Sequence, residues 1–132
     1  MSFETAVQTA VYNALTADAG LMALVTGVYD AVPQTETYPY VTIGEDIHNE
    51  WDTYDGLGSD CSVVVDTWSR GRGRKETKAI QGEIYDALNR AVLTYSGYDI
   101  INIAFVSSSS FMDADGLTRH GVSTFRVLIE RN

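Results

Sequence analysis

The sequence has 132 residues, which suits one folded domain over residues 1–132 and is too short for two domains of ordinary size. Hydrophobic residues make up 45% of the chain and charged residues 20%, a globular composition that excludes a disordered or low-complexity protein. The 18 acidic and 9 basic residues give a formal net charge of −9, which argues against a dedicated nucleic-acid-binding protein because phosphates would be repelled.

The first predicted element is an amphipathic helix from Ser2 to about Ala17. Ser2 has the position of an N-cap, and Glu4 falls in the first turn, where the helix dipole favours an anion. The apolar residues recur at the spacing of a single stripe along one helix face: Ala6, Val7, Ala10, Val11, Ala14 and Leu15. We expect this stripe to face the core.

A second, short helix is predicted directly afterwards. Asp18 has the position of its cap, and the helix continues through Leu21, Leu24 and Val25 until Gly27 ends it. The next five residues, 28–32, are predicted to form a short strand. Residues 33–39 are predicted to be a loop, because two prolines flank a polar run.

Two longer strands are predicted next, over 40–50 and 61–69. The first alternates, with one face formed by Val41, Ile43 and Ile47 and the other by Thr42, Asp46 and His48. Glu45 interrupts the apolar face, which predicts a strand end or a bulge near Gly44. The second strand is rich in β-branched residues. The acidic, turn-rich residues 52–60 between them predict a long hairpin with a mobile tip.

The remaining chain predicts a second long helix and a closing hairpin. Residues 70–75 break the strand and open the helix, whose core-facing residues are Ile80, Ile84, Leu88, Ala87 and Ala91. The two arms of the hairpin alternate through Ile101, Ile103 and Phe105 and through Phe125, Val127 and Ile129, around a turn at 113–116. The predicted fold is α+β, a mostly antiparallel sheet with two long helices packed on one face.

Residues that could carry chemistry are few. His48 and His120 are the only histidines and Cys61 is the only cysteine; they lie far apart without the spacing of zinc ligands. Residues 113–116 resemble the start of a calcium loop, but Thr124 stands where that loop needs a glutamate. We therefore expect no catalytic residue, no metal and no cofactor, with two surface or structural histidines and a buried Cys61.

Signals for compartment are weak. A single cysteine cannot form an intramolecular disulfide, which suits a reducing compartment. The N-terminus lacks the basic and apolar regions of a signal peptide, and no window approaches about 18 apolar residues. We expect no contact with a membrane.

The charge changes sign in the turn before the second long helix. Five of the nine basic residues fall within nine positions there: Arg70, Arg72, Arg74, Lys75 and Lys78. A Gly-x-Gly before a helix is typical of phosphate-binding loops, but the other residues of the dinucleotide and P-loop motifs are absent. The turn is therefore either a solvated loop or a contact surface for an acidic partner.

An acidic group precedes it in the chain, formed by Glu45, Asp46, Glu50, Asp52, Asp55 and Asp60. It could be a metal site, a solvated loop or a contact face; an exposed hairpin tip does not offer the cleft that paired catalytic carboxylates need. A molecule with two unlike poles favours head-to-tail contacts between identical copies. Tyrosine and tryptophan, which are enriched at interfaces, are also numerous in this chain. The residues that we expect at interfaces are Arg70, Arg72, Arg74, Lys75, Trp51, Asp52, Asp55 and Asp60.

The order of these pieces resembles a known family, the tail completion proteins of long-tailed bacteriophages, also called tail terminators or head-to-tail joining proteins. The most diagnostic stretch is Tyr38-Pro-Tyr-Val-Thr-Ile-Gly-Glu45. The resemblance covers nearly the whole chain and also rests on residues 18–30, 68–70, 75–78, 84–88, 113–122 and 125–126. The glycine- and arginine-rich turn at 70–75 departs from the family pattern.

The resemblance implies a structural virion protein and no enzyme. It implies a homo-oligomeric ring, typically a hexamer, at the head-proximal end of a tail made in the bacterial cytoplasm. The ring would cap the major tail tube protein, end its polymerisation and join the head-tail connector or stopper protein. Genome DNA would pass through its lumen without specific binding.

Two other classes of function remain open from the residues alone. A small acidic binding module, such as an inhibitor that mimics nucleic acid, would stay small until its basic target is added. A small α+β enzyme would use His48 or His120, and the sequence offers no substrate for it.

Overall fold

The structure is organised around one sheet of six strands in the order β1-β2-β3-β6-β5-β4. It is a computed structural model that describes residues 2–34, 37–54, 56–71 and 73–132. The strands are β1 (Val28–Tyr29), β2 (Tyr40–Glu50), β3 (Gly58–Ser69), β4 (Thr94–Tyr95), β5 (Tyr98–Met112) and β6 (Arg119–Arg131). All neighbouring pairs are antiparallel except β1 and β2, which run parallel, so the sheet is mixed.

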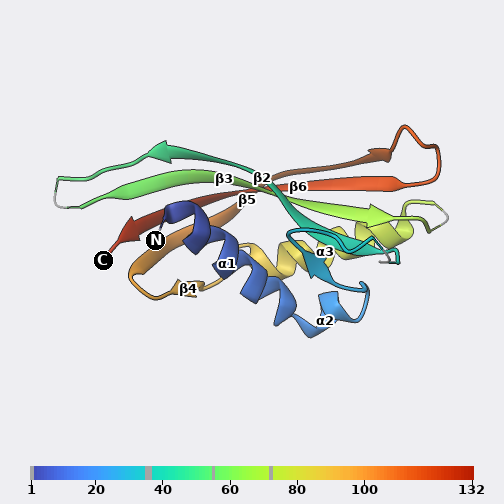
Figure 1. Ribbon diagram of the computed structural model, residues 1–132, viewed down its shortest axis with the longest axis horizontal. Helices are drawn as coiled ribbons and strands as arrows, with labels where there is room; N and C mark the ends of the chain where they lie inside the picture. The colour runs from blue at the N-terminus through green and yellow to red at the C-terminus, as the bar shows by residue number, and fades with distance from the viewer. Residues whose placement is uncertain (1, 35–36, 55, 72) are drawn as a thin grey trace.

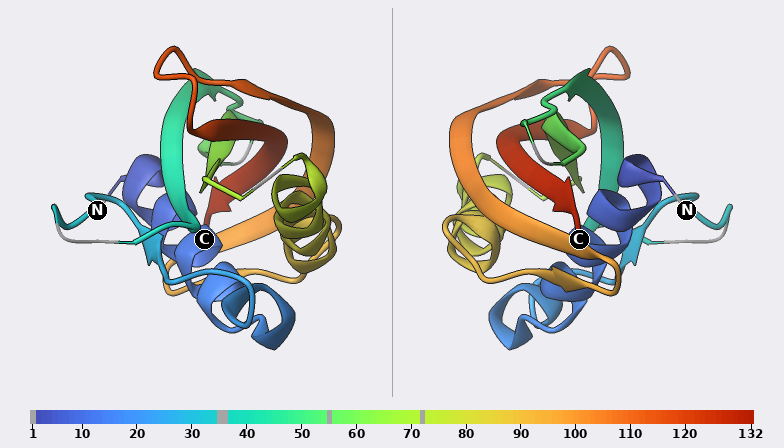
Figure 2. Two further views of the ribbon diagram at one scale, coloured as in Figure 1. Left: turned by 90° about the vertical axis from the view of Figure 1, so that its right-hand side faces the viewer. Right: turned by 90° about the vertical axis from the view of Figure 1, so that its left-hand side faces the viewer.

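In the described part of the chain, three helices accompany the sheet: α1 (Phe3–Thr16), α2 (Ala19–Met22) and α3 (Lys75–Leu88). The strands curl around the helical part of the molecule (Figure 2). Apolar residues of α1 and α3 join those of the strands in a single buried cluster. The fold is therefore α+β, as predicted. It differs from the prediction in its parallel β1–β2 pair and in the curl of the sheet.

The helices begin where their caps predict. The Ser2 side chain accepts a hydrogen bond from the Thr5 amide, and the predicted apolar stripe of α1 is buried apart from the half-buried Ala14. Asp18 accepts from the Leu21 amide at 2.9 Å and caps α2. Helix α2 ends earlier than predicted, because the backbone after it is held by β2: the Thr26 amide donates to Pro39 O, and Gly27 O accepts from the Val41 amide.

A bulge in β2 reverses the face on which its later residues lie. Ile43 pairs with Val65 and Asp46 with Val63, so three steps along β2 match two along β3. The bulge near Gly44 is confirmed. The predicted inward side for Ile47 is wrong, since the extra residue turns it outward and leaves it 62% exposed.

The same effect changes β5. Its register with β6 shifts between Ile100 and Asn102, and Ile101, predicted to face the core, is 52% exposed. A second shift lies between Phe105 and Ser107. The partner strand β6 has no such interruption against β3, and its predicted core residues Phe125, Val127 and Ile129 are all buried.

Two hairpins extend the sheet in opposite directions along the long axis of the molecule (Figure 1). The β2–β3 hairpin reaches one end, and the β5–β6 hairpin reaches the other, where the turn between β3 and α3 also lies. Within the described residues, none of the helices is long and apolar enough to cross a membrane.

Candidate functional site

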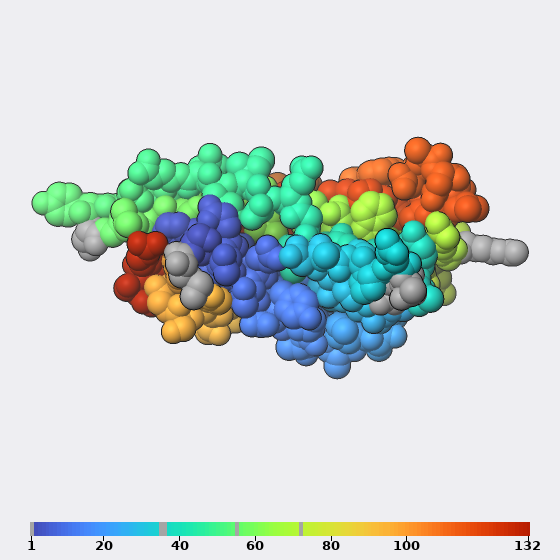
Figure 3. Space-filling model, in the orientation of Figure 1, coloured from blue at the N-terminus to red at the C-terminus, as the bar shows by residue number. Residues whose placement is uncertain are grey.

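Among the described residues, the acids at the end of β2 and the start of β3 lie at the opposite end of the molecule from the bases at the start of α3 (Figure 1), whereas Glu45 and Asp46 lie within β2. The tip of the β2–β3 hairpin, described for residues 51–54 and 56–57, projects beyond the body at one end (Figure 3). The described residues of the turn, 70–71 and 73–74, and the start of α3 lie at the other end (Figure 1). A contact between these two groups therefore requires two copies of the chain.

The tip of the β2–β3 hairpin is built by backbone hydrogen bonds. The Trp51 amide donates to Gly58 O at 3.0 Å, and Thr53 and Gly56 exchange two bonds of 2.9 and 3.3 Å. Tyr54 stands beyond them with its side chain fully in solvent, at a relative exposure of 107%. An exposed tyrosine on a hydrogen-bonded tip can act as an anchor, because its ring brings apolar area and its hydroxyl a polar end.

The acids of this end differ in how they are paired. Asp60 accepts two hydrogen bonds from the Arg126 guanidinium, at 2.9 and 2.6 Å, and this contact lowers the pKa of Asp60. A hydrogen bond to Asp52 and the charge of that residue raise the pKa of Glu50. Asp52 also accepts from the Gly58 amide at 3.1 Å. Crowded carboxylates therefore remain at the base of the tip, whereas Asp60 is paired within the chain. Asp55 lies outside the described residues.

The residues of the basic turn also differ in how many contacts they make with the rest of the chain. Arg70 Nε donates to Thr118 Oγ1 at 3.1 Å, its Nη2 lies 3.7 Å from Asp115, and its guanidinium lies 4.3 Å from the centre of the Tyr38 ring. Arg70 therefore joins the turn to the β5–β6 hairpin. Its internal partner is Asp115; the neighbouring acids Asp66 and Glu76 contact His120 and Ser69 instead.

The next basic residues make fewer internal contacts. Arg74 precedes α3, is exposed and makes no capping hydrogen bond with its side chain. Lys75 is the exposed first residue of α3. Neither takes part in a salt bridge in the part of the chain that the structure describes. Arg72 is outside that part.

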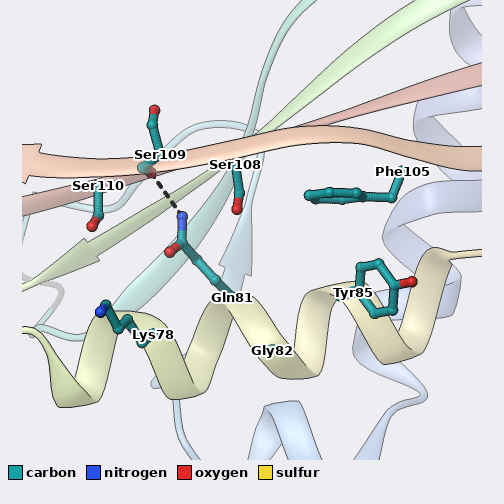
Figure 4. A pocket seen from close by; sticks show the side chains of 8 residues that line it. All are labelled: Lys78, Gln81, Gly82, Tyr85, Phe105, Ser108, Ser109 and Ser110. Carbon is teal, nitrogen blue, oxygen red and sulfur yellow. Dashed lines mark hydrogen bonds between the residues drawn. The ribbon is translucent and has the colours of Figure 1, made fainter.

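A groove of about 350 Å³ lies between α3 and β5 (Figure 4). Tyr85 and Phe105 form its aromatic end, with ring centres 5.1 Å apart and planes at 70°. Lys78 lies at the opposite end of the groove. Gly82 on α3 lies between the two ends and, having no side chain, leaves the groove open at this position. It is lined by Lys78, Gln81, Gly82, Tyr85, Phe105, Ser108, Ser109 and Ser110. This groove was not predicted from the sequence, although Gly82 in the middle of a predicted helix is a signal that could have indicated it.

Gln81 of α3 and the two residues that follow this helix cap the outer edge of β5 around this groove. Gln81 donates to Ser109 O at 2.9 Å, the Phe105 amide donates to Asn89 Oδ1 at 2.9 Å, and the Arg90 amide donates to Ile103 O at 2.8 Å. Capped edges resist the addition of another strand. A partner at this face would therefore meet side chains rather than extend the sheet.

The histidines have structural partners. Nδ1 of His48 lies 2.9 Å from the sulfur of Cys61, and its Nε2 lies 2.8 Å from Asp46. His120 stacks on Trp68 with ring centres 3.9 Å apart. Burial raises the pKa of the Cys61 thiol, which disfavours the thiolate that a nucleophile requires. The predicted burial of Cys61 is confirmed.

Among the described residues, no group of three or more histidine, cysteine or acidic side chains is arranged to hold a metal ion. The turn predicted at 113–116 is confirmed: the Gly116 amide donates to Asp113 O, and Gly116 has φ of 71°. Hydrogen bonds from Thr118 and Leu117 lower the pKa of Asp115 to about 2.

Comparison with known proteins gives consistent matches over nearly the whole chain. The profile of a family described as "Tail completion protein gp17" matches residues 9–130. The tail completion protein gp17 of Bacillus phage SPP1 is 28% identical over 127 residues, which cover 96% of this chain and 94% of that protein.

Two solved structures are similar. A chain in a structure titled "Virion of native gene transfer agent (GTA) particle" is 31% identical, with a TM-score of 0.91 over 98% of this chain and 99% of that one. The structure of bacteriophage SPP1 gp17 protein is 26% identical, with a TM-score of 0.65 over 93% of this chain and 88% of that one.

Proposed function

Because the chain belongs to the tail completion protein gp17 family, we propose that it acts as a tail terminator: a homo-oligomeric ring, with six subunits, at the head-proximal end of a phage tail. Tail completion proteins are structural components of virions. The observation that carries the proposal is the superposition of 98% of the chain on a chain of a gene transfer agent virion, with a TM-score of 0.91.

The protein would act through the way its ring binds neighbouring tail proteins and not through catalysis. One face of the ring binds the last layer of the major tail tube protein and ends polymerisation of the tube. The other face binds the head-tail connector or stopper protein. Genome DNA passes through the lumen, where an excess of acidic residues repels phosphate and keeps it from adhering.

The shape and charge of the subunit support a ring. Its two ends differ, with an acidic hairpin at one and a basic turn at the other (Figure 1). Contacts between unlike surfaces of identical copies generate closed rings when the rotation between neighbours closes. The head-proximal position and the two partner proteins are proposed from the resemblance to the tail completion family.

Deletion of the gene in the phage or prophage tests this function. We expect full heads and separate tails of irregular length, seen by electron microscopy, and restoration of joined particles when the gene is supplied in trans. Normal infectious particles from the deletion would overturn the proposal. The native mass of the purified protein tests ring formation separately: an assembling protein gives a large species at high concentration, whereas an acidic inhibitor stays small.

A further inference from the structure

We propose that the groove between α3 and β5 receives the tip of the β2–β3 hairpin of a neighbouring copy, with Tyr54 as the anchoring side chain. This inference rests on the proposed ring and names the two surfaces that would join its subunits. Four observations support it: the open space at Gly82, the aromatic wall of the groove, the complementary charges of the tip and the groove, and the distance between these two surfaces within one molecule.

The first observation is the empty space above Gly82. A Cβ at this position would have no atom within 4 Å other than those of its chain neighbours and of the backbone of its own helix, and the residue lies in the middle of α3. Glycine in a helix interior costs about 1 kcal/mol relative to alanine. Nothing within the described part of this chain fills the space that the glycine leaves, which is the arrangement expected where a partner approaches the helix closely.

The second observation is the chemistry of the groove wall. Tyr85 is 41% exposed and meets Phe105 edge to face, and both rings line the groove (Figure 4). Aromatic pairs prefer such edge-to-face or offset arrangements, so a third ring can extend the cluster. Tyr54 is the most exposed of the large hydrophobic residues in the described chain. Ser108 and Ser110 direct their hydroxyls toward α3 (Figure 4), where they can hydrogen-bond with the phenol group of Tyr54.

The third observation is complementary charge. Glu50 and Asp52 crowd two carboxylates at the base of the tip, and the interaction with Asp52 raises the pKa of Glu50. Lys78 lies at one end of the groove, and it forms no salt bridge among the described residues. An ammonium group brought near the two carboxylates would relieve their repulsion.

The fourth observation is distance along the molecule. The tip occupies one end of the long axis, and α3, which forms one wall of the groove, lies on the half that carries the β5–β6 turn (Figure 1). A subunit therefore cannot fill its own groove with its own tip. Each copy keeps one tip and one groove, so the contact is heterologous and can repeat from subunit to subunit until a ring closes.

The experiment uses two purified full-length variants. Tyr54→Ser removes the anchor from a fully exposed position, and Gly82→Gln fills the groove with a better helix former. We expect each variant to keep the melting curve of the wild type or, for Gly82→Gln, to raise it. We expect each to raise the concentration for half-assembly, measured by sedimentation velocity, at least about 30-fold, the size of an interface hot spot.

Mixing the two variants gives the sharpest result. The Tyr54→Ser copy keeps its groove and the Gly82→Gln copy keeps its tip, so together they can form one contact but no ring. We expect heterodimers from the mixture, detected by native mass spectrometry, and monomers from either variant alone. Val92→Ser, at another highly exposed apolar residue, and Gly82→Ala, which adds little bulk, are the matched controls and should assemble like the wild type.

The outcomes separate this contact from the ring itself. If the wild type forms rings and either test variant also forms them at the same concentration, the contact is overturned and the ring stands. If both variants form rings but fail to join heads to tails, the tip binds a different tail protein and the contact between copies is again overturned. A wild type that stays monomeric at every concentration, alone and with the tube protein, would overturn both proposals.

Discussion

Arg126 on β6 binds Asp60 on β3 through two hydrogen bonds, of 2.9 and 2.6 Å, although 66 positions separate the two residues in the chain. Paired charges of this geometry are the strongest type of surface ion pair. The pair removes Asp60 from the set of acids with which this end of the molecule can attract a partner. It leaves Glu50 and Asp52 as the acids at the base of the hairpin tip.

Replacing Arg126 with glutamine should reduce stability in a manner that depends on pH. Arg126 lowers the pKa of Asp60 in the folded protein, so the stabilisation is present above the unfolded pKa of Asp60 and is lost as pH falls through the folded value. We expect a small decrease in Tm at pH 7 that disappears on acidification. Thermal unfolding of both proteins across a pH series checks this, and a difference that grows at low pH would contradict it.

The Asp115 carboxylate should contribute to stability with the same sign of pH dependence as Asp60. Hydrogen bonds from Thr118 and Leu117 lower the pKa of Asp115 from 3.8 to about 2. The carboxylate therefore stabilises the β5–β6 hairpin fully above 3.8 and loses this contribution as pH falls through about 2. Asp115→Asn should lower Tm at neutral pH and match the wild type near pH 2. Equal Tm values at pH 7 would argue against the role of this carboxylate.

Asn89 should be a stability determinant because it caps β5. Its Oδ1 accepts from the Phe105 amide at 2.9 Å, and its amide group donates to the Tyr85 hydroxyl at 3.0 Å. Asn89→Ala would leave a partly buried amide without its partner, at a cost of about 1–3 kcal/mol. Urea denaturation measures this change. Asn102→Ala, which removes a longer bond of 3.3 Å to Arg90 at the surface, is the control and should cost less.

The tip of the β2–β3 hairpin should be mobile in the free subunit and ordered in the assembly. Among the described residues, the backbone hydrogen bonds of the tip join Trp51 to Gly58 and Thr53 to Gly56, and ordering the tip costs about 1–2 kcal/mol per residue against little apolar area. Amide hydrogen exchange should be fast between Trp51 and Gly58 in monomers and slow in rings. Strong protection of these amides in the monomer would contradict this expectation.

Local sequence patterns predicted where the helices and strands lie. They did not predict which face of the sheet the residues at and after the bulges occupy. Ser2 and Asp18 cap their helices as expected, since capping depends on a few neighbouring residues. Ile47 and Ile101 lie on the side opposite to that predicted. An inserted residue moves the later residues of the strand to the other face of the sheet. The position of the insertion depends on the pairing with the partner strand.

The sequence predicted the charged clusters of the candidate site but not the ion pairs that their residues form. The clusters around Asp52 and Arg74 can be read from the sequence, because they are local in the chain. The pairs Asp60–Arg126 and Arg70–Asp115 join residues that only the sheet brings together. The groove above Gly82 depends on the packing of α3 against β5, which no local pattern specifies.

The last prediction separates the basic residues that hold the fold from those that serve an interface. Arg70 contacts Thr118, Asp115 and Tyr38, so Arg70→Ser should lower the Tm of the monomer. Arg74 and Lys75 are exposed at the start of α3, and their joint replacement by serine should leave the monomer's Tm nearly unchanged.

The same Arg74 and Lys75 double variant should weaken assembly, because each exposed ion pair contributes about 0.2–1 kcal/mol and the contact repeats around a ring. Salt screens such pairs, so assembly of the wild type should weaken as salt rises while that of the variant responds less. Sedimentation velocity across a salt series measures both. Arg72→Ser is made as a separate variant, because its position is not described. Unchanged assembly of the double variant at all salt concentrations would show that these two residues lie outside the interface, and unfolding of its monomer would show that they belong to the fold.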